Sequence, residues 1–342
     1  MKPLLAITMG DTNGVGPEIL VKALAHPEPW DVCHPFVVGS APVFEEVRRW
    51  VPNCPPARRC HSIAEARMGG TFTPVMEVGV MEGGLDAPVY DPGQLDPAAG
   101  KCAVEWVKLA VKLALEKQID GIVTCPINKE GVHKAGYTFA GHTDLIADMC
   151  GAPDYRMCLF AGAMRVVHNS AHVSLRQAID LVTADRVATS IRIAHDGLLR
   201  LKTPRKRIAV AALNPHAGEA GAFGTEDAEI IAPAVAQCQQ LGIACSGPYP
   251  ADTVFRRMQQ GEFDLVVAMY HDQGHAPMKL IAMDEGVNVT LGIPIIRTSV
   301  DHGTAYDIAG TGAAREQSLL AAITLAAEMA ATQSAGETPA PQ

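Results

Sequence analysis

The sequence lacks the features of a membrane or secreted protein. No stretch approaches the run of about 18 consecutive apolar residues that a membrane-spanning helix needs. The first residues run into Gly10 without the pattern of a signal-peptide cleavage site. The chain has nine cysteines but no Cys-x-x-Cys pair, which argues against a disulfide framework and a structural zinc knuckle. We therefore expect a cytoplasmic protein with no membrane partner.

Basic residues are also scarce, since 28 lysines and arginines stand against 37 acidic residues and give a net charge of −9. This charge disfavours nucleic acid as a partner, because an acidic surface repels a phosphate backbone. A small anionic substrate must then be held by a few cations placed in one pocket. The 48% hydrophobic content excludes disorder for most of the chain. Only residues 333–342, which are small, polar and rich in proline, predict a disordered tail.

Short apolar runs alternate with amphipathic segments along the chain. The runs predict strands, and the segments, with apolar residues at steps of three and four, predict helices. The strands are expected at 4–9, 36–39, 121–124, 157–160, 208–213 and 265–269, and the best helices at 98–118, 184–199, 226–241 and 316–329. This alternation is typical of an α/β fold with a largely parallel sheet. Ligands of such sheets bind beyond the carboxyl ends of the strands, which is where the unusual residues fall.

A glycine-rich cluster, Gly10-Asp11-Thr12-Asn13-Gly14-Val15-Gly16-Pro17, follows the first strand directly. It fails as a dinucleotide fingerprint, because Ile19 stands where a third glycine belongs. The cluster predicts a tight turn into a helix that begins near Pro17. Such a helix start points amide groups at whatever lies above it, but a plain structural turn explains the residues equally well.

Histidines follow several of the apolar runs. They are His142, His172, His216 and His271. Three neutral imidazoles that converge from strand ends form a catalytic zinc-type set with one position left for water or substrate. Spacing alone does not prove that they converge, and a single histidine is more often a surface or core residue. Taken alone, the set also permits a metal-dependent hydrolase that uses no nucleotide.

Two further groups of residues indicate ligand binding. Lys279, Asn288 and Arg297 combine two cations with an amide, a set that suits phosphate or carboxylate. Arg297 ends a run too apolar to be a surface face, which favours a functional role. The loop from His302 to Gly310 consists of small residues with Asp307 among them. Such a loop suits an adenosine whose ribose hydroxyl binds the carboxylate, although a helix-capping loop would look the same.

Taken together, the motifs closely resemble those of the 4-hydroxythreonine-4-phosphate dehydrogenase family. The resemblance runs from about residue 5 to 330 and rests on the motifs at 9–18, 141–143, 214–219, 270–274 and 297–305. It implies a two-lobed isocitrate/isopropylmalate-dehydrogenase-like α/β/α sandwich, a homodimer and NAD or NADP. It also implies one divalent metal per site, Zn or else Mg, Co or Mn.

The resemblance assigns roles to individual residues. The implied metal ligands are His172, His216 and His271, with the first two in one chain and the third in its partner. The implied substrate contacts are His142, Thr143, Lys279, Asn288 and Arg297, and the implied cofactor contacts are His302, Gly303, Thr304, Ala305 and Asp307. Residues 1–125 with 285–332 would form the cofactor-side lobe, and 126–284 the metal-binding and dimerisation lobe.

Two departures from the pattern of the pyridoxine-biosynthetic members bear on the substrate. Those members usually have Leu-Pro after the first metal histidine and after Asp-Gln-Gly, whereas this chain has Val173-Ser174 and His275-Ala276. The departures resemble the branch that acts on D-threonate or D-erythronate 4-phosphate. The related cis-dihydrodiol dehydrogenases of terephthalate breakdown are an alternative, but a diol without phosphate has less need of Asn288 and Arg297.

The implied reaction oxidises a secondary hydroxyl β to a carboxylate, transfers a hydride to the nicotinamide and then releases carbon dioxide. Protonation of the resulting enolate needs a general acid. The candidates are Lys279, Asp272 and Asp252, which the sequence does not rank. A sugar-phosphate binding protein without activity is a weaker alternative, because a metal site with an open position is the catalytic pattern.

Overall fold

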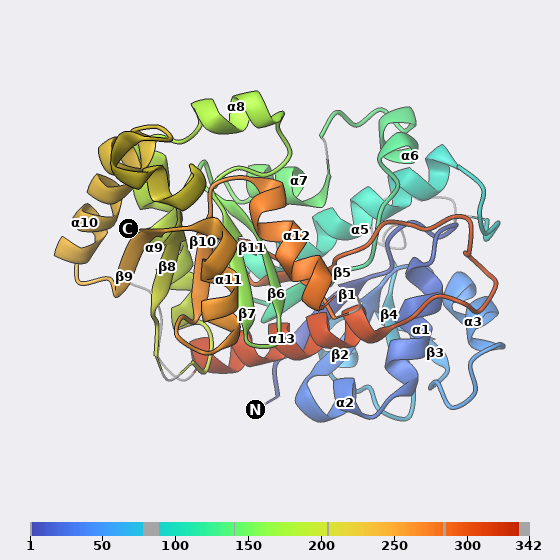
Figure 1. Cartoon of the computed structure of the whole chain (residues 1–342). Helices are drawn as coiled ribbons and strands as arrows, with labels where there is room; N and C mark the ends of the chain where they lie inside the picture. Colours follow the sequence, from blue (N-terminus) through green and yellow to red (C-terminus); the bar gives the residue numbers. More distant parts are fainter. Residues whose placement is uncertain (1, 78–88, 140, 204, 283–284, 335–342) are drawn as a thin grey trace. The chain divides into compact units, whose positions relative to one another are not determined.

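The computed structural model describes residues 2–77, 89–139, 141–203, 205–282 and 285–334. The chain divides into two compact units, which Figure 1 shows coloured along the sequence. The first unit comprises residues 1–153 and 293–331, and the second comprises 154–292 and 332–342. The sequence analysis expected the divisions near 125 and 285. The first unit therefore keeps the segment 126–153, which includes α6 (Lys129–Lys134) and α7 (His142–Met149).

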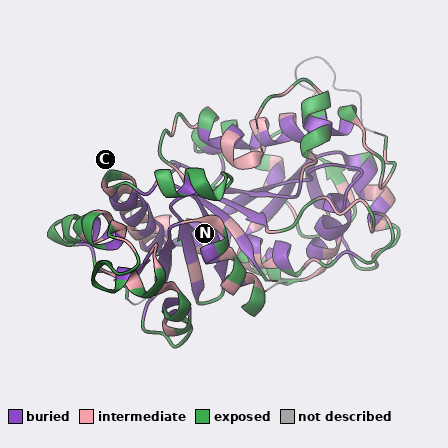
Figure 2. Ribbon diagram, turned by 45° about the horizontal axis from the view of Figure 1, so that its top comes forward, coloured by how far each residue is buried: buried purple, intermediate pink, exposed green. Residues whose placement is uncertain are grey.

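The first unit contains a parallel sheet whose central strands are buried (Figure 2), whereas its edge strand, residues 57–59, is largely exposed. Its order is β3 (Ala57–Arg59), β4 (Thr73–Met76), β2 (His34–Val38), β1 (Leu4–Thr8), β5 (Gly121–Thr124) and β12 (Arg297–Val300). All of these neighbours pair in parallel. In the centre, Ala6 lies between Phe36 and Ile122. Continuous apolar strands of this kind are typical of a parallel sheet covered on both faces.

Helices lie between these strands along the chain, and one more follows the last strand. They are α1 (Gly16–Ala25), α2 (Glu28–Val32), α3 (Ala41–Arg48), α4 (Ile63–Ala66), α5 (Pro97–Leu115), α6 (Lys129–Lys134), α7 (His142–Met149) and α13 (Gln317–Ser334). The local sequence explains where α5 begins, because the Asp96 carboxylate accepts a hydrogen bond from the Ala98 amide, 2.8 Å away, and Pro97 takes the first helical position.

The second unit contains a mixed sheet. Its order is β11 (Val287–Leu291), β6 (Arg156–Ala161), β7 (Met164–His168), β10 (Leu265–Ala268), β8 (Ile208–Ala211) and β9 (Cys245–Tyr249). β6 pairs antiparallel with both β11 and β7, and the remaining neighbours are parallel. Its helices are α8 (Leu175–Asp180), α9 (Ala184–Leu199), η1 (Pro215–Gly221), η2 (Asp227–Ile231), α10 (Ala232–Gln240), α11 (Ala251–Gln259) and α12 (His271–Ile281). Val166, Val266 and Met258 are among the residues of its buried core.

The predicted α/β class is confirmed, and several predicted elements match closely. β5 and α9 have the predicted bounds. Of the predicted tail, Gln333 and Ser334 instead end α13, and 335–342 lie outside the described residues. Among the described residues no helix is both long enough and apolar enough to cross a membrane.

Candidate active site

The glycine-rich cluster after β1 forms the predicted tight turn into α1, and it also anchors the predicted cofactor loop. The Val15 amide donates to the Thr304 carbonyl at 2.9 Å. A Cβ on Gly14 would lie 2.9 Å from the Thr304 Cβ, so only glycine permits this approach. The Tyr306 hydroxyl donates to Asp11 Oδ2 at 2.8 Å, and burial raises the pKa values of both groups. The cluster and the loop therefore form one structure.

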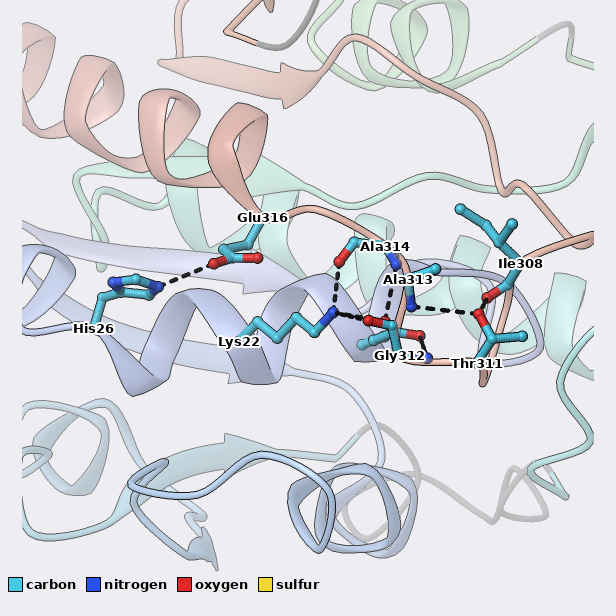
Figure 3. Close-up of polar contacts among 9 residues, drawn as sticks. Lys22, His26, Ile308, Thr311, Gly312, Ala313, Ala314 and Glu316 are labelled. Atoms are coloured by element: carbon cyan, nitrogen blue, oxygen red, sulfur yellow. Dashed lines mark hydrogen bonds and ion pairs between the residues drawn. The ribbon is translucent and has the colours of Figure 1, made fainter.

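The segment that follows this loop is fixed to α1 (Figure 3). Lys22 Nζ donates to the carbonyls of Gly312 and Ala314, at 2.8 and 2.6 Å, and to Glu18 Oε1 at 2.8 Å. The buried Glu18 carboxylate in turn accepts the Ala314 amide at 3.0 Å. His26 Nε2 lies 3.0 Å from Glu316 Oε1, at the start of α13. These bonds hold both ends of the segment.

The predicted cofactor residues differ in exposure. His302, Gly303 and Asp307 are exposed, whereas Thr304 and Ala305 are partly buried. Ala305 has a φ of +41°, in the region that L residues seldom adopt. The loop is thus a constrained turn that presents His302, Gly303 and Asp307 to solvent.

Three of the predicted substrate residues come together in the first unit. Arg297, at the start of β12, is only 2% exposed. Its Nη2 donates to Thr124 Oγ1 at 2.9 Å, and its Nη1 donates to Thr143 Oγ1 at 3.5 Å. Burial lowers the pKa of the guanidinium to about 9, so these surroundings stabilise its charge poorly. The sequence analysis missed Thr124, which ends β5.

His142 begins α7 next to this arginine. Burial and the charge of Arg297 lower the pKa of His142 well below its usual value, so its imidazole is neutral. Its Nε2 is buried and has no hydrogen-bond partner within the described part of the chain. A buried polar atom of this kind is costly unless a ligand satisfies it. Arg297, Thr143 and His142 therefore suit an anionic ligand.

The other two predicted substrate residues belong to the second unit. Lys279 is partly buried in α12, and Asn288 is partly buried in β11. Of the candidate acids, Asp252 is exposed in the first turn of α11 and Asp272 is exposed in the first turn of α12.

Two of the predicted metal ligands lie close together in the second unit. The Asn169 amide donates to the Ala268 carbonyl at 2.8 Å, which joins the ends of the paired strands β7 and β10. His172 follows β7 and His271 opens α12 after β10. Their ring centroids lie 5.8 Å apart. The His271 Nδ1 lies 2.7 Å from the Asp272 carboxylate, an arrangement that leaves Nε2 for a metal.

His216 lies in an unusual turn, η1, in which it and the five following residues have positive φ. The turn is anchored by the buried Asp227 carboxylate, which accepts the amides of Leu213 and Asn214 at 2.8 and 3.1 Å. The His216 ring is exposed, and its Nδ1 lies 3.1 Å from Glu219 Oε2. Among the described residues of this chain, no three histidine, cysteine or acidic side chains are placed to hold a metal ion together.

Two histidines to which the sequence analysis gave no role in the site lie beside His271. His275 stacks on His271 with ring centroids 3.9 Å apart, and its Nδ1 lies 2.9 Å from Nε2 of His168. Burial lowers the pKa of His168 to about 4, and burial also lowers the pKa of His275. The spacing His271-x-x-x-His275 was the signal in the sequence, because residues four apart share one face of a helix.

Comparison with known proteins agrees with the resemblance. The family described as "Pyridoxal phosphate biosynthetic protein PdxA" matches residues 31–326. The chain is 43% identical to the D-threonate 4-phosphate dehydrogenase of Cupriavidus necator, over 96% of this chain and 97% of that protein. It is 44% identical to the 4-hydroxythreonine-4-phosphate dehydrogenase of Geobacter metallireducens, over 98% of each.

A solved structure shares the fold. The crystal structure of 4-hydroxythreonine-4-phosphate dehydrogenase from Klebsiella pneumoniae superposes with a TM-score of 0.85 at 40% identity, over 96% of this chain and 100% of that one.

Proposed function

Because this chain belongs to the PdxA family, we propose that it is an NAD(P)-dependent dehydrogenase that oxidises and decarboxylates a 4-phosphorylated four-carbon hydroxy acid. D-threonate 4-phosphate is the first candidate, with D-erythronate 4-phosphate and 4-hydroxythreonine 4-phosphate beside it. The observation that carries the proposal is the buried Arg297 with two threonine hydroxyls beside it, because such a set of groups suits a phosphate or carboxylate.

In this proposal Arg297 and Thr143 bind the phosphate end of the substrate. A bound phosphate supplies the negative charge that the buried guanidinium favours, and it accepts hydrogen bonds from both the guanidinium and the hydroxyl. His142 is neutral, so it donates or accepts one hydrogen bond without adding charge. Anchoring this end orients the hydroxyl carbon toward the cofactor.

The residues of the loop 302–310 fit a nicotinamide dinucleotide. Asp11 and Val15 hold the loop in place, and His302 and Asp307 remain exposed on it. An exposed carboxylate on a rigid small-residue loop suits a ribose hydroxyl. When bound, the dinucleotide accepts the hydride and a divalent metal adds Lewis acidity toward developing negative charge on oxygen.

The residues of the second unit fit a divalent metal in part. We assign His172, His216 and His271 as ligands, shared between the chains of a homodimer, with Zn as the first candidate and Mg, Co or Mn as others. The support is the Asp272 carboxylate, which orients His271, and the strained turn that exposes His216. The described residues of one chain do not hold this set together, and in a two-fold dimer the partner chain would complete it.

For the proton that completes the reaction, we propose Lys279 rather than the two aspartates. The Asp272 carboxylate already accepts a hydrogen bond from His271. Asp252 is exposed at the start of α11. Lys279 is partly buried, and its charge adds to burial in lowering the pKa of His275, which supports an ammonium close to His275. An ammonium can donate a proton to an enolate.

The test is NADH or NADPH formation by the purified protein. The substrates are D-threonate, D-erythronate and 4-hydroxythreonine 4-phosphates, with a terephthalate cis-dihydrodiol for the alternative dehydrogenase. Reduction of the cofactor with one of the phosphates, and carbon dioxide release in equal amount, is the expected result. Turnover of the dihydrodiol alone would overturn the proposal.

A metal-dependent hydrolase is the alternative from another class of enzyme, and only the histidines favour it. A hydrolase binds no dinucleotide and therefore has no need of the loop 302–310. NAD alone is expected to slow hydrogen exchange of this loop in the dehydrogenase, and a hydrolase would show no such protection.

A further inference from the structure

The segment 311–314, which directly follows the loop 302–310, has little contact with the core. Thr311, Gly312 and Ala313 are exposed, and Ala314 is buried. A segment that buries so little apolar surface is ordinarily mobile, because few hydrophobic contacts oppose its conformational entropy. Polar contacts are therefore the main source of order in this segment.

Glu18 and Lys22 provide these contacts from one face of α1 (Figure 3). They are four residues apart and form an ion pair, with 2.8 Å between Oε1 and Nζ. The Glu18 carboxylate accepts the amides of Gly312 and Ala314, at 3.3 and 3.0 Å. The Lys22 ammonium donates to the carbonyls of the same two residues, at 2.8 and 2.6 Å. The ion pair thus binds the donor and the acceptor of both residues, which fixes their backbone in place.

The burial of this ion pair makes the arrangement mutual. The Glu18 side chain is 2% exposed and that of Lys22 is 20% exposed. A buried ion pair is favourable only when further hydrogen bonds satisfy its atoms, and the four backbone groups of the segment do this. Hydrogen bonds to charged groups are also about twice as strong as bonds between neutral groups. The ion pair and the segment therefore stabilise one another.

Thr311 connects this segment to the loop 302–310. Its hydroxyl donates to the Ile308 carbonyl at 2.7 Å and accepts the Ala313 amide at 3.3 Å, as Figure 3 shows. The Ile308 amide in turn donates to the carbonyl of Ala305 at 3.1 Å, and Ala305 is the loop residue with a φ of +41°. A continuous series of hydrogen bonds therefore runs from the segment into the constrained turn of the loop.

We propose that Glu18, Lys22 and Thr311 are positioning residues for the dinucleotide, because they hold the loop 302–310 in the conformation that binds it. They act through the loop and are not assigned to contact the cofactor themselves. A loop that is ordered before binding loses less conformational entropy when the ligand binds, and this raises the affinity. The inference rests on the proposed function in taking this loop as the cofactor site.

The first test removes the Thr311 hydroxyl and leaves the buried charges in place. Isothermal titration calorimetry of the full-length protein measures the Kd for NAD and for NADP. For the dinucleotide that the wild type binds more tightly, we expect Thr311→Val to raise the Kd about 3- to 10-fold, as suits the loss of a neutral hydrogen bond. Hydrogen exchange of residues 302–310 in the ligand-free protein should become faster. Thr311→Ser keeps the hydroxyl and should restore both values.

Thr253→Val is the matched control in the second unit. Thr253 is exposed, and its hydroxyl donates to the carbonyl of the residue three positions earlier, as the hydroxyl of Thr311 does. Its Kd and its loop exchange should match those of the wild type. An unchanged Kd in Thr311→Val, or a Kd that Thr311→Ser fails to restore, overturns the role of Thr311.

A double-mutant cycle tests whether the ion pair acts through Thr311. Glu18→Gln combined with Lys22→Met removes both charges together, so that no unpaired charge stays buried. We expect this variant to bind the dinucleotide about 10-fold more weakly, since it loses charge-assisted bonds. Adding Thr311→Val to it should then change the Kd less than about twofold, because residues of one network are not additive. Losses that simply multiply would contradict a shared route.

The binding assay and the dehydrogenase assay fail independently. If the wild type oxidises a phosphorylated acid but Thr311→Val binds the dinucleotide equally well, the proposed function stands and this inference falls. If Thr311→Val weakens dinucleotide binding but no substrate is oxidised, the positioning role stands and the proposed function falls. A wild type that binds neither NAD nor NADP overturns both.

Discussion

Arg297→Lys separates the contribution of the planar guanidinium geometry to substrate binding from the contribution of its positive charge. The native side chain is 2% exposed and donates from Nη2 to Thr124 and from Nη1 to Thr143. Lysine keeps a positive charge but cannot make two parallel bonds to a phosphate. The loss of one charge-assisted bond costs about 1.5–3 kcal/mol. At 1.4 kcal/mol for each factor of ten, the KM for the phosphorylated substrate should rise roughly 10- to 150-fold.

Steady-state kinetics of cofactor reduction, with substrate and NAD(P) varied in turn, measures this effect. The KM for NAD(P) should hardly change, because the predicted cofactor loop begins beyond β12, at His302. Ser299→Ala is a matched control on the same strand, since its hydroxyl donates to the Thr124 carbonyl at 3.0 Å and is not assigned to the substrate. Equal losses for substrate and cofactor in Arg297→Lys would refute the reasoning and make Arg297 a structural residue.

Other predictions concern the metal, the subunits and the cofactor loop. Removal of metal by a chelator, or the substitution His216→Ala, should abolish turnover. The circular dichroism spectrum should not change, because catalytic metals need not hold a domain together. Full activity of the metal-free protein would exclude a catalytic metal. Inactive His216→Ala and His271→Ala chains refolded together should regain roughly one quarter of wild-type activity, since about half the dimers are mixed and each has one intact site. Verified dimers without activity would place each site within one chain. Tyr306→Phe removes the hydroxyl that donates to Asp11, so it should lower the free energy of unfolding by about 1–3 kcal/mol and speed hydrogen exchange in residues 302–310. Unchanged exchange would show that this bond does not hold the loop.

Much of the architecture was accessible from sequence because periodicity reports burial. β5 and α9 were predicted to the residue, since each is a simple apolar run or stripe bounded by polar residues. The boundary between the units was not found in this way. The chain leaves the first unit at Pro153, after α6 and α7, and these short helices carry no composition change that marks them as part of it.

Part of the proposed substrate site was also predictable. An arginine at the end of a run too apolar for a surface face was expected to lie away from solvent, and Arg297 is buried. Thr124 could not be identified, because nothing in the sequence distinguishes it from other residues that end a strand. Its position beside Arg297 depends on the pairing of β12 with β5. His168 is similar, since its contact with His275 depends on α12 packing against β7. Sequence patterns identify the residues of one element and say little about neighbours from another.

The turn that holds His216 shows most clearly what a sequence does not display. His216 has a φ of +51°, and three of the five positive-φ residues that follow it are not glycine. Left-handed backbone costs roughly 1–2 kcal/mol for each such residue, so this turn persists only because other contacts impose it. The buried Asp227 does so by accepting two amides at the start of the turn, and a Cβ on Gly218 would lie 2.9 Å from the Gly224 carbonyl. The strained backbone does not serve to bury the His216 side chain, because its ring is exposed. Strain of this kind clusters at functional sites, so the conformation of this turn favours a ligand role for His216 more strongly than its spacing from the other histidines does.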